Sequence, residues 1–142
     1  MGISDRVNPD FSRVPKASRF EETILGLIML RREYVHRTVD GQSVTDDDMP
    51  TALGKRLLSA ILSGEENGGF GFEMLNESFT QDEVSRAEKM QVDRMKLSDN
   101  GPDVFDGTLR ALREENEKTR NKDDGDFLYF IRKKRGEASP DQ

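Results

Sequence analysis

The chain of 142 residues contains no cysteine and only one histidine, His36. The absence of cysteine excludes disulfides, thiolate zinc sites and a thiol nucleophile. A histidine that acts as a catalytic base needs an orienting partner and a nucleophile, and the sequence indicates neither around His36. We therefore interpret His36 as a partly exposed polar residue.

Long apolar runs and an excess of basic residues are also missing. No segment approaches the roughly 18 apolar residues of a membrane-spanning helix, and the start MGISDRVNPD has no signal-peptide core. Arg6 stands where a myristoylation motif requires Ser or Thr. The net charge of -6 argues against strong direct binding to nucleic acid, because phosphate contacts need a basic face. We expect a cytoplasmic protein without a membrane segment.

Signatures of catalysis are scarce. The GGFG stretch at 68–71 lacks the G-K-[ST] ending of a phosphate-binding loop and follows a helix instead of a strand. Asp46, Asp47 and Asp48 precede Pro50, where carboxylates commonly complement a helix dipole. We therefore predict no catalytic residue, metal or cofactor in this chain. A small magnesium-dependent transferase that uses Asp46 to Asp48 remains an alternative.

The residues that are present indicate helices. Residues 1–17 contain two prolines without periodicity, so we predict a linker from an upstream core. Ser18 and Glu21 have the spacing of a capping box, and apolar residues at helical spacing follow from Ile24. Pro50 predicts a second helix start, and Thr80 with Glu83 predicts a third. Strand-like alternation is absent, so the predicted fold class is all-α.

The C-terminal region combines a polar stretch with an apolar segment. We predict a helix from 103 to 121, a turn at Asp123-Asp124-Gly125 and a last helix in DFLYFIRKKRG, residues 126–136. The predicted organisation is a compact helical bundle subdomain at 18–102, a C-terminal helical hairpin at 103–136 and a disordered tail at 137–142.

The last helix allows two interpretations. It either docks on the preceding helix, or it awaits another protein, since REENEKTRNKDD offers no apolar cover for two phenylalanines. We favour the second interpretation, because exposed aromatic residues beside arginine are typical of interface hot spots.

Several motifs in order resemble a known family. The stretch DRVNPDFSRVPKASRFEETILGLIML and the later KRLLSAILSGEENGGFGFEMLNESFTQDEVSRAEKM are similar to the region that follows the catalytic core of bacterial DnaG-type primases. This resemblance implies a helicase-interaction domain that docks on the N-terminal domains of the DnaB-type replicative helicase. It implies partner-binding residues Phe127, Tyr129, Phe130, Arg132 and Lys133. It also implies that the chain alone is not an enzyme and that primer synthesis belongs to a longer parent protein.

One alternative within replication stays open. The N-terminal collar domain of a DnaB-type helicase shares this helical fold and would self-associate through the hairpin. The NP linker, and the end of the chain directly after the hairpin, favour the primase interpretation.

Overall fold

The computed structural model describes residues 5–135, with side chains described as far as residue 121. In that part of the chain the α-helices are α1 (Pro15–Leu30), α2 (Ala52–Glu66), α3 (Gln81–Met95) and α4 (Pro102–Arg135). Short 3-10 helices lie at Phe11–Arg13, Arg32–His36, Asp46–Asp48 and Phe72–Leu75. No strand forms among the described residues apart from an isolated bridge between Val39 and Gln42. The predicted all-α, compact helical fold is confirmed.

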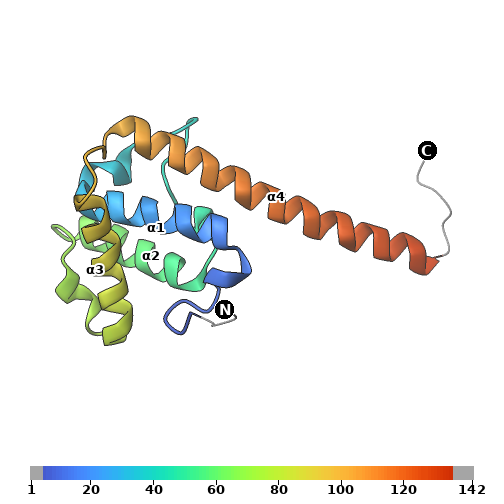
Figure 1. Cartoon of the computed structure of the whole chain (residues 1–142), viewed down its shortest axis with the longest axis horizontal. Helices are drawn as coiled ribbons and strands as arrows, with labels where there is room; N and C mark the ends of the chain where they lie inside the picture. Colours follow the sequence, from blue (N-terminus) through green and yellow to red (C-terminus); the bar gives the residue numbers. More distant parts are fainter. Residues whose placement is uncertain (1–4, 136–142) are drawn as a thin grey trace.

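Helix α1 lies at the centre of the molecule and contacts each of the other three α-helices (Figure 1). Pro15 begins it, where a missing N–H costs nothing. The chain leaves the helix at Arg31, which has an extended backbone. Ile24, Leu25, Leu27 and Ile28 are fully buried. The prediction that this helix is buried on most sides is therefore confirmed, although it begins three residues before Ser18.

A glycine sets the close approach of α1 and α3. A Cβ atom on Gly26 would collide with the backbone carbonyl of Met90, and the side chain of Arg94 lies next to the same spot. Helix packing with so little space is available only to a residue without a side chain. Ala87 and Met90 of α3 are buried against α1 nearby.

The capping box predicted for α3 is confirmed. The Glu83 backbone N–H donates to Thr80 Oγ1 over 3.1 Å, and the Thr80 N–H donates to Glu83 Oε1 over 3.0 Å. The side chain of Arg56 on α2 donates to the same carboxylate and lies over the Phe79 ring. A local cap thus also joins α3 to α2.

The predicted N-terminal linker is part of the packed structure from residue 5 onward. Asp5 accepts hydrogen bonds from Arg86 of α3 over 2.7 and 3.1 Å, and Asn8 is buried. Asp10 accepts a hydrogen bond from the Ala52 N–H at the start of α2. Side chains of this segment therefore hold it on α2 and α3, which its proline content alone did not reveal. Residues 1–4 and the predicted tail at 137–142 lie outside the described residues.

The turn predicted at Asp123-Asp124-Gly125 is absent, and one continuous helix, α4, replaces the predicted hairpin. No proline lies between Pro102 and Arg135, so every residue there can donate the helical N–H. Glycine inside a helix costs only about 1 kcal/mol. Ion pairs one turn apart offset part of that cost, as at Lys118–Glu115 and Arg120–Glu117. The prediction of a turn was wrong because these residues disfavour a helix without preventing it.

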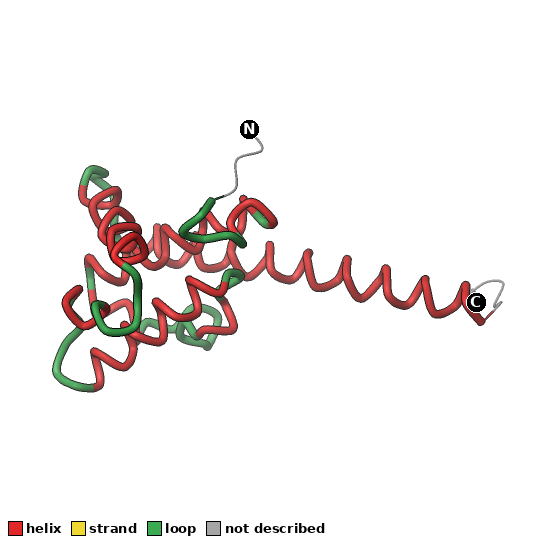
Figure 2. Tube along the Cα trace, turned by 90° about the horizontal axis from the view of Figure 1, so that it is seen from below, coloured by secondary structure: helices red, strands yellow, loops and turns green. Residues whose placement is uncertain are grey.

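Two parts of the molecule follow from this arrangement, and we call them the head and the arm. The head comprises residues 5–116, and the arm is the distal part of α4, residues 117–135. Figures 1 and 2 show the arm leaving the head and continuing alone. None of the helices in the described part of the chain combines the length and apolarity that crossing a bilayer requires.

We predict that Gly26→Ala destabilises the protein and that Gly107→Ala stabilises it. The first change forces α1 away from α3 and should cost about 1–3 kcal/mol. The second lies in an exposed part of α4 with nothing within 4 Å of the new Cβ, and should add about 0.5–1 kcal/mol. Urea denaturation of both variants measures the difference, and a stable Gly26→Ala protein would contradict the packing described here.

Candidate partner-binding site

The five residues predicted to bind a partner all lie on the arm. Positions 127, 129, 130, 132 and 133 belong to the last turns of α4, at the end remote from the head (Figure 1). Their side chains lie outside the described residues, so their role in binding stays a prediction. The backbone does not fold back on the head there, which removes the alternative of a last helix docked on a preceding one.

A continuous helix places these residues on two faces. At 3.6 residues per turn, 18 residues complete five turns, so Phe127 shares a face with Leu109 and Phe130 shares one with Leu112. Leu109 and Leu112 are fully buried against the head. The two phenylalanine positions therefore continue the head-facing side of α4.

Two of the three other predicted residues lie on a different side of the helix. At 100° per residue, Tyr129 and Arg132 fall roughly opposite the phenylalanine positions, whereas Lys133 lies between the two faces, about 60° from Phe130. A single flat partner surface therefore cannot engage all five residues of the predicted set equally.

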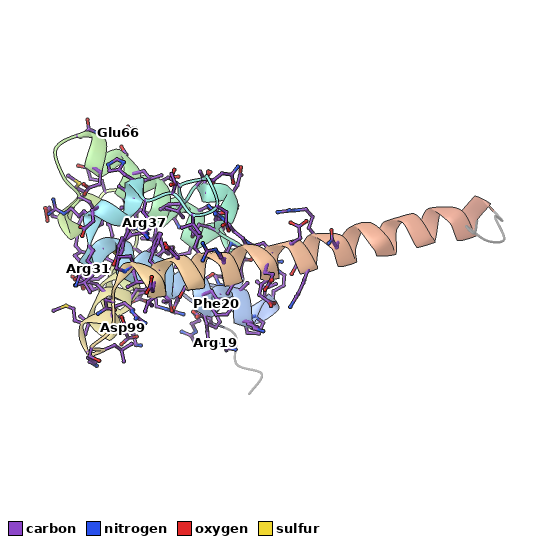
Figure 3. The ribbon with its side chains drawn as sticks, turned by 90° about the horizontal axis from the view of Figure 1, so that it is seen from above. Arg19, Phe20, Arg31, Arg37, Glu66 and Asp99 are labelled. Carbon is purple, nitrogen blue, oxygen red and sulfur yellow. The ribbon has the colours of Figure 1, made fainter. Side chains whose placement is uncertain are left out.

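The start of α4 is fixed to the head by an aromatic pair and an ion pair. Phe105 stacks on Tyr34 with ring centroids 4.7 Å apart, and Tyr34 donates a hydrogen bond to the Asn100 carbonyl over 2.6 Å. Arg37 holds Asp106 with two hydrogen bonds of 2.6 and 2.8 Å. This bidentate pairing lowers the pKa of the Asp106 carboxyl. Figure 3 shows Arg37 beside the first turns of α4.

Arg113 fixes α4 at the point where it leaves the head. Its guanidinium donates to Asp48 over 3.0 and 3.3 Å and to the carbonyls of Val39, Gln42 and Ser43. Asn116 donates to the Asp48 carbonyl over 2.8 Å. Among residues 117–121, the described side chains beyond Asn116, none donates a hydrogen bond to a residue outside α4. The direction of the arm is therefore set by one loop, residues 39–48.

A shallow pocket of about 290 Å³ lies in the angle between the head and the arm. We call it the junction pocket; it is lined by Arg13, Val14, Asp47, Met49, Pro50, Lys55, Asn116, Thr119 and Arg120. Three of these residues are cationic and one is anionic, so the pocket suits a partner with acidic groups. Sequence analysis missed it, because its lining comes from three segments far apart in the chain.

In the acidic triplet at 46–48, the Asp48 side chain binds other residues of the head. Asp48 is engaged by Arg113 and also accepts a hydrogen bond from the Thr45 N–H. Among residues 5–121, whose side chains the structure describes, no group of three or more histidine or acidic residues is arranged to hold a metal ion.

A second surface was missed for a different reason. Val92, Met95 and Leu97, near the end of α3, are 42%, 61% and 52% exposed. They lie off the apolar stripe of α3, which runs through Val84, Ala87 and Met90. Apolar residues at helix positions outside the buried face are the sequence signal that predicts such a surface.

Glu21 of α1 lies at the centre of a buried polar network in the head. It was predicted to form a capping box with Ser18, but its carboxylate accepts hydrogen bonds from the Thr51 N–H and hydroxyl, over 3.1 and 2.7 Å. Thr51 in turn caps α2 by accepting from the Gly54 N–H. The Asn8 side-chain amide donates to Thr51 Oγ1 over 3.3 Å, and its side-chain Oδ1 is buried without a described partner. Ser18 donates to the Phe11 carbonyl instead.

Burial raises the pKa of Glu21 to about 7, although the hydrogen bonds from Thr51 act in the opposite direction. The charged form loses hydration that two donors do not fully replace. A Cβ atom on Gly54 would collide with the Glu21 carboxylate, so the carboxylate lies directly against α2. The network therefore joins the N-terminal segment, α1 and α2, at the cost of burying an acid.

We predict that Arg113→Ala destabilises the protein by about 1–3 kcal/mol, because it removes an ion pair and leaves carbonyl oxygens without donors. The matched control is Arg110→Ala. Arg110 pairs with Asp40 on the surface, where both side chains are more than half exposed, and its loss should cost under about 0.5 kcal/mol. Urea denaturation of both variants provides the comparison. Equal losses would show that Arg113 does not anchor α4.

We predict that Glu21→Gln removes a pH dependence of stability. A carboxyl whose pKa is about 7 when folded and 4.5 when unfolded stabilises the fold fully below pH 4.5. This contribution, on the order of 3 kcal/mol, is lost as the pH rises through 7. Glu21→Gln should therefore show a flatter stability profile between pH 4.5 and 8.

The control for this measurement is Glu66→Gln, at an exposed position on the head (Figure 3). Burial also raises the pKa of Glu22, and Glu22 is unchanged in both variants. Thermal melts across the pH range should separate the two proteins. Identical slopes for wild type and Glu21→Gln would contradict the assignment.

No protein-family model, curated protein or solved structure that we compared with the chain matches it.

Proposed function

We propose that this chain is a non-catalytic binding module, the helicase-interaction domain at the C-terminus of a bacterial DnaG-type primase. In this proposal it docks on the N-terminal domains of the DnaB-type replicative helicase in the bacterial cytoplasm and brings primase to the replication fork. Primer synthesis and its cofactors belong to the rest of the parent protein. The resemblance of the segments at residues 5–30 and 55–90 to that family supports the proposal.

The observation that carries the proposal is the arm. Beyond Asn116, whose side chain makes the last described hydrogen bond from α4 to another element, the helix continues from residue 117 to Arg135, roughly 28 Å at 1.5 Å per residue. The arm is polar until Asp126, and then five apolar or aromatic residues precede four cations. An apolar segment at the end of a projecting helix is available to another protein, and burial of each large side chain contributes about 1.5–3 kcal/mol.

The test is sedimentation velocity of the labelled chain with the replicative helicase of the same bacterium. We predict co-migration at micromolar concentration, and loss of affinity by at least about tenfold in Phe127→Ala/Phe130→Ala. A second variant, Tyr129→Ala/Arg132→Ala, removes side chains from the opposite face and identifies which side of the arm is bound.

The matched control is Met95→Ala/Leu97→Ala, which removes exposed apolar side chains from the head instead of the arm. Circular dichroism checks that each variant remains helical. Absence of co-migration in the wild type would refute the proposal. Equal binding by wild type and both arm variants would show that the arm is not the contact.

A further inference from the structure

The arm is a helix without cover from its own head. In REENEKTRNKDDGD, residues 113–126, no residue is apolar, and helices in water depend on packing of an apolar face for most of their stability. Figure 2 shows no other described element beside the distal turns of α4. A second polypeptide against the distal turns would supply that packing.

The charges at residues 123–135 of the arm are arranged so that two antiparallel copies would have opposite charges beside each other. Acidic residues Asp123, Asp124 and Asp126 come first, the apolar run 127–131 follows, and the cations at 132–135 come last. Because α4 is continuous through all of them, these blocks lie along one straight axis. Two such helices that run in opposite directions place acids beside cations at both ends of a shared apolar centre.

We propose that the partner of this face is a second copy of the chain, with the two arms paired antiparallel about a two-fold axis between positions 128 and 129. In that register position 127 lies opposite 130 of the other copy, and position 123 lies opposite 134. The acidic block of each copy then lies beside the cationic block of the other. A parallel pair would place acid beside acid and cation beside cation, which is unfavourable.

The helical spacing supports this register. Positions 123, 127, 130 and 134 follow each other at intervals of four and three residues, the spacing of the contact positions in paired helices. The same series reaches back through 120, 116 and 113 to Leu109, which is buried against the head. The second arm therefore approaches along the side of α4 that faces the head.

The polar residues on this seam limit the overlap. Arg113 and Asn116 are occupied with the head, and position 120 is an arginine. The paired region thus extends over about residues 123–134, roughly 18 Å of helix. Two helices paired over that length are expected to bury less surface than the roughly 1,200 Å² of a stable complex. We therefore expect a weak dimer whose population depends on concentration.

Pairing with a second copy goes beyond the proposed function and does not rest on it. Should both hold, a second copy and the helicase compete for the positions of Phe127 and Phe130. The experiment below contains no helicase, so its failure leaves the helicase proposal untouched, and failure of helicase binding leaves the pairing untouched.

The test uses two charge-reversed variants of the full chain. The first is Asp123→Lys/Asp124→Lys/Asp126→Lys, and the second is Arg132→Glu/Lys133→Glu/Lys134→Glu. By sedimentation equilibrium up to about 1 mM we expect wild type to dimerise and each variant alone to associate at least tenfold more weakly. An equimolar mixture of the two variants should recover dimers, because every opposed block again has opposite charge. Circular dichroism verifies that both variants fold.

Direction is tested by cross-linking, which the absence of natural cysteine makes simple. Asp123→Cys mixed with Lys134→Cys should yield disulfide-linked dimers of the two different chains, whereas either alone should not. Glu117→Cys, outside the paired region, is the control. A monomeric wild type at about 1 mM would overturn the proposal, as would unchanged association of the reversed variants. Cross-linking of Asp123→Cys to itself would also overturn it.

Discussion

The absence of apolar residues between Leu112 and Phe127 is the constraint on which the rest of the structure depends. Phe105, Leu109 and Leu112 are fully buried and hold the first turns of α4 on α1. The following residues give the head nothing to bury, so attachment passes to Arg113 and Asn116 and then ends. Since nothing in the sequence breaks the helix at that point, it continues away from the head. The division into head and arm is therefore a consequence of side-chain composition along one helix.

Attachment of α4 by hydrogen bonds instead of apolar contacts concentrates the orientation of the arm in a small region. Arg113 donates to three carbonyl oxygens of the loop at 39–48, whose own regular structure is limited to the Val39–Gln42 bridge and one 3-10 turn. The loop and the helix thus order each other. A charged donor with several acceptors gives direction as well as energy, which apolar packing provides less well.

Local sequence patterns predicted some elements correctly, and they failed where contacts between distant residues determine the hydrogen-bond partners. Thr80 and Glu83 form the capping box because both lie at the surface, where Glu83 can accept from the Thr80 N–H and from Arg56 at the same time. Ser18 and Glu21 have the same spacing, yet Glu21 is buried and bonds with Thr51, thirty residues away along the chain. The Asp-Asp-Gly sequence suggested a turn, but turn residues only lower helix stability and no proline enforces a break. The junction pocket had no local signal at all, because Arg13, Lys55 and Arg120 meet only in the folded chain.

A straight helix couples distance to direction. Each residue between Leu112 and Phe130 moves the tip by about 1.5 Å and turns it by about 100°. The length of the polar stretch therefore sets both the distance of residues 127–135 from the head and the direction in which they face. Deletion of one residue would rotate them by about 100° about the helix axis, whereas removal of a whole number of turns would shorten the arm and keep their orientation. Homologous chains that conserve no side chain in this stretch would still be expected to keep its length.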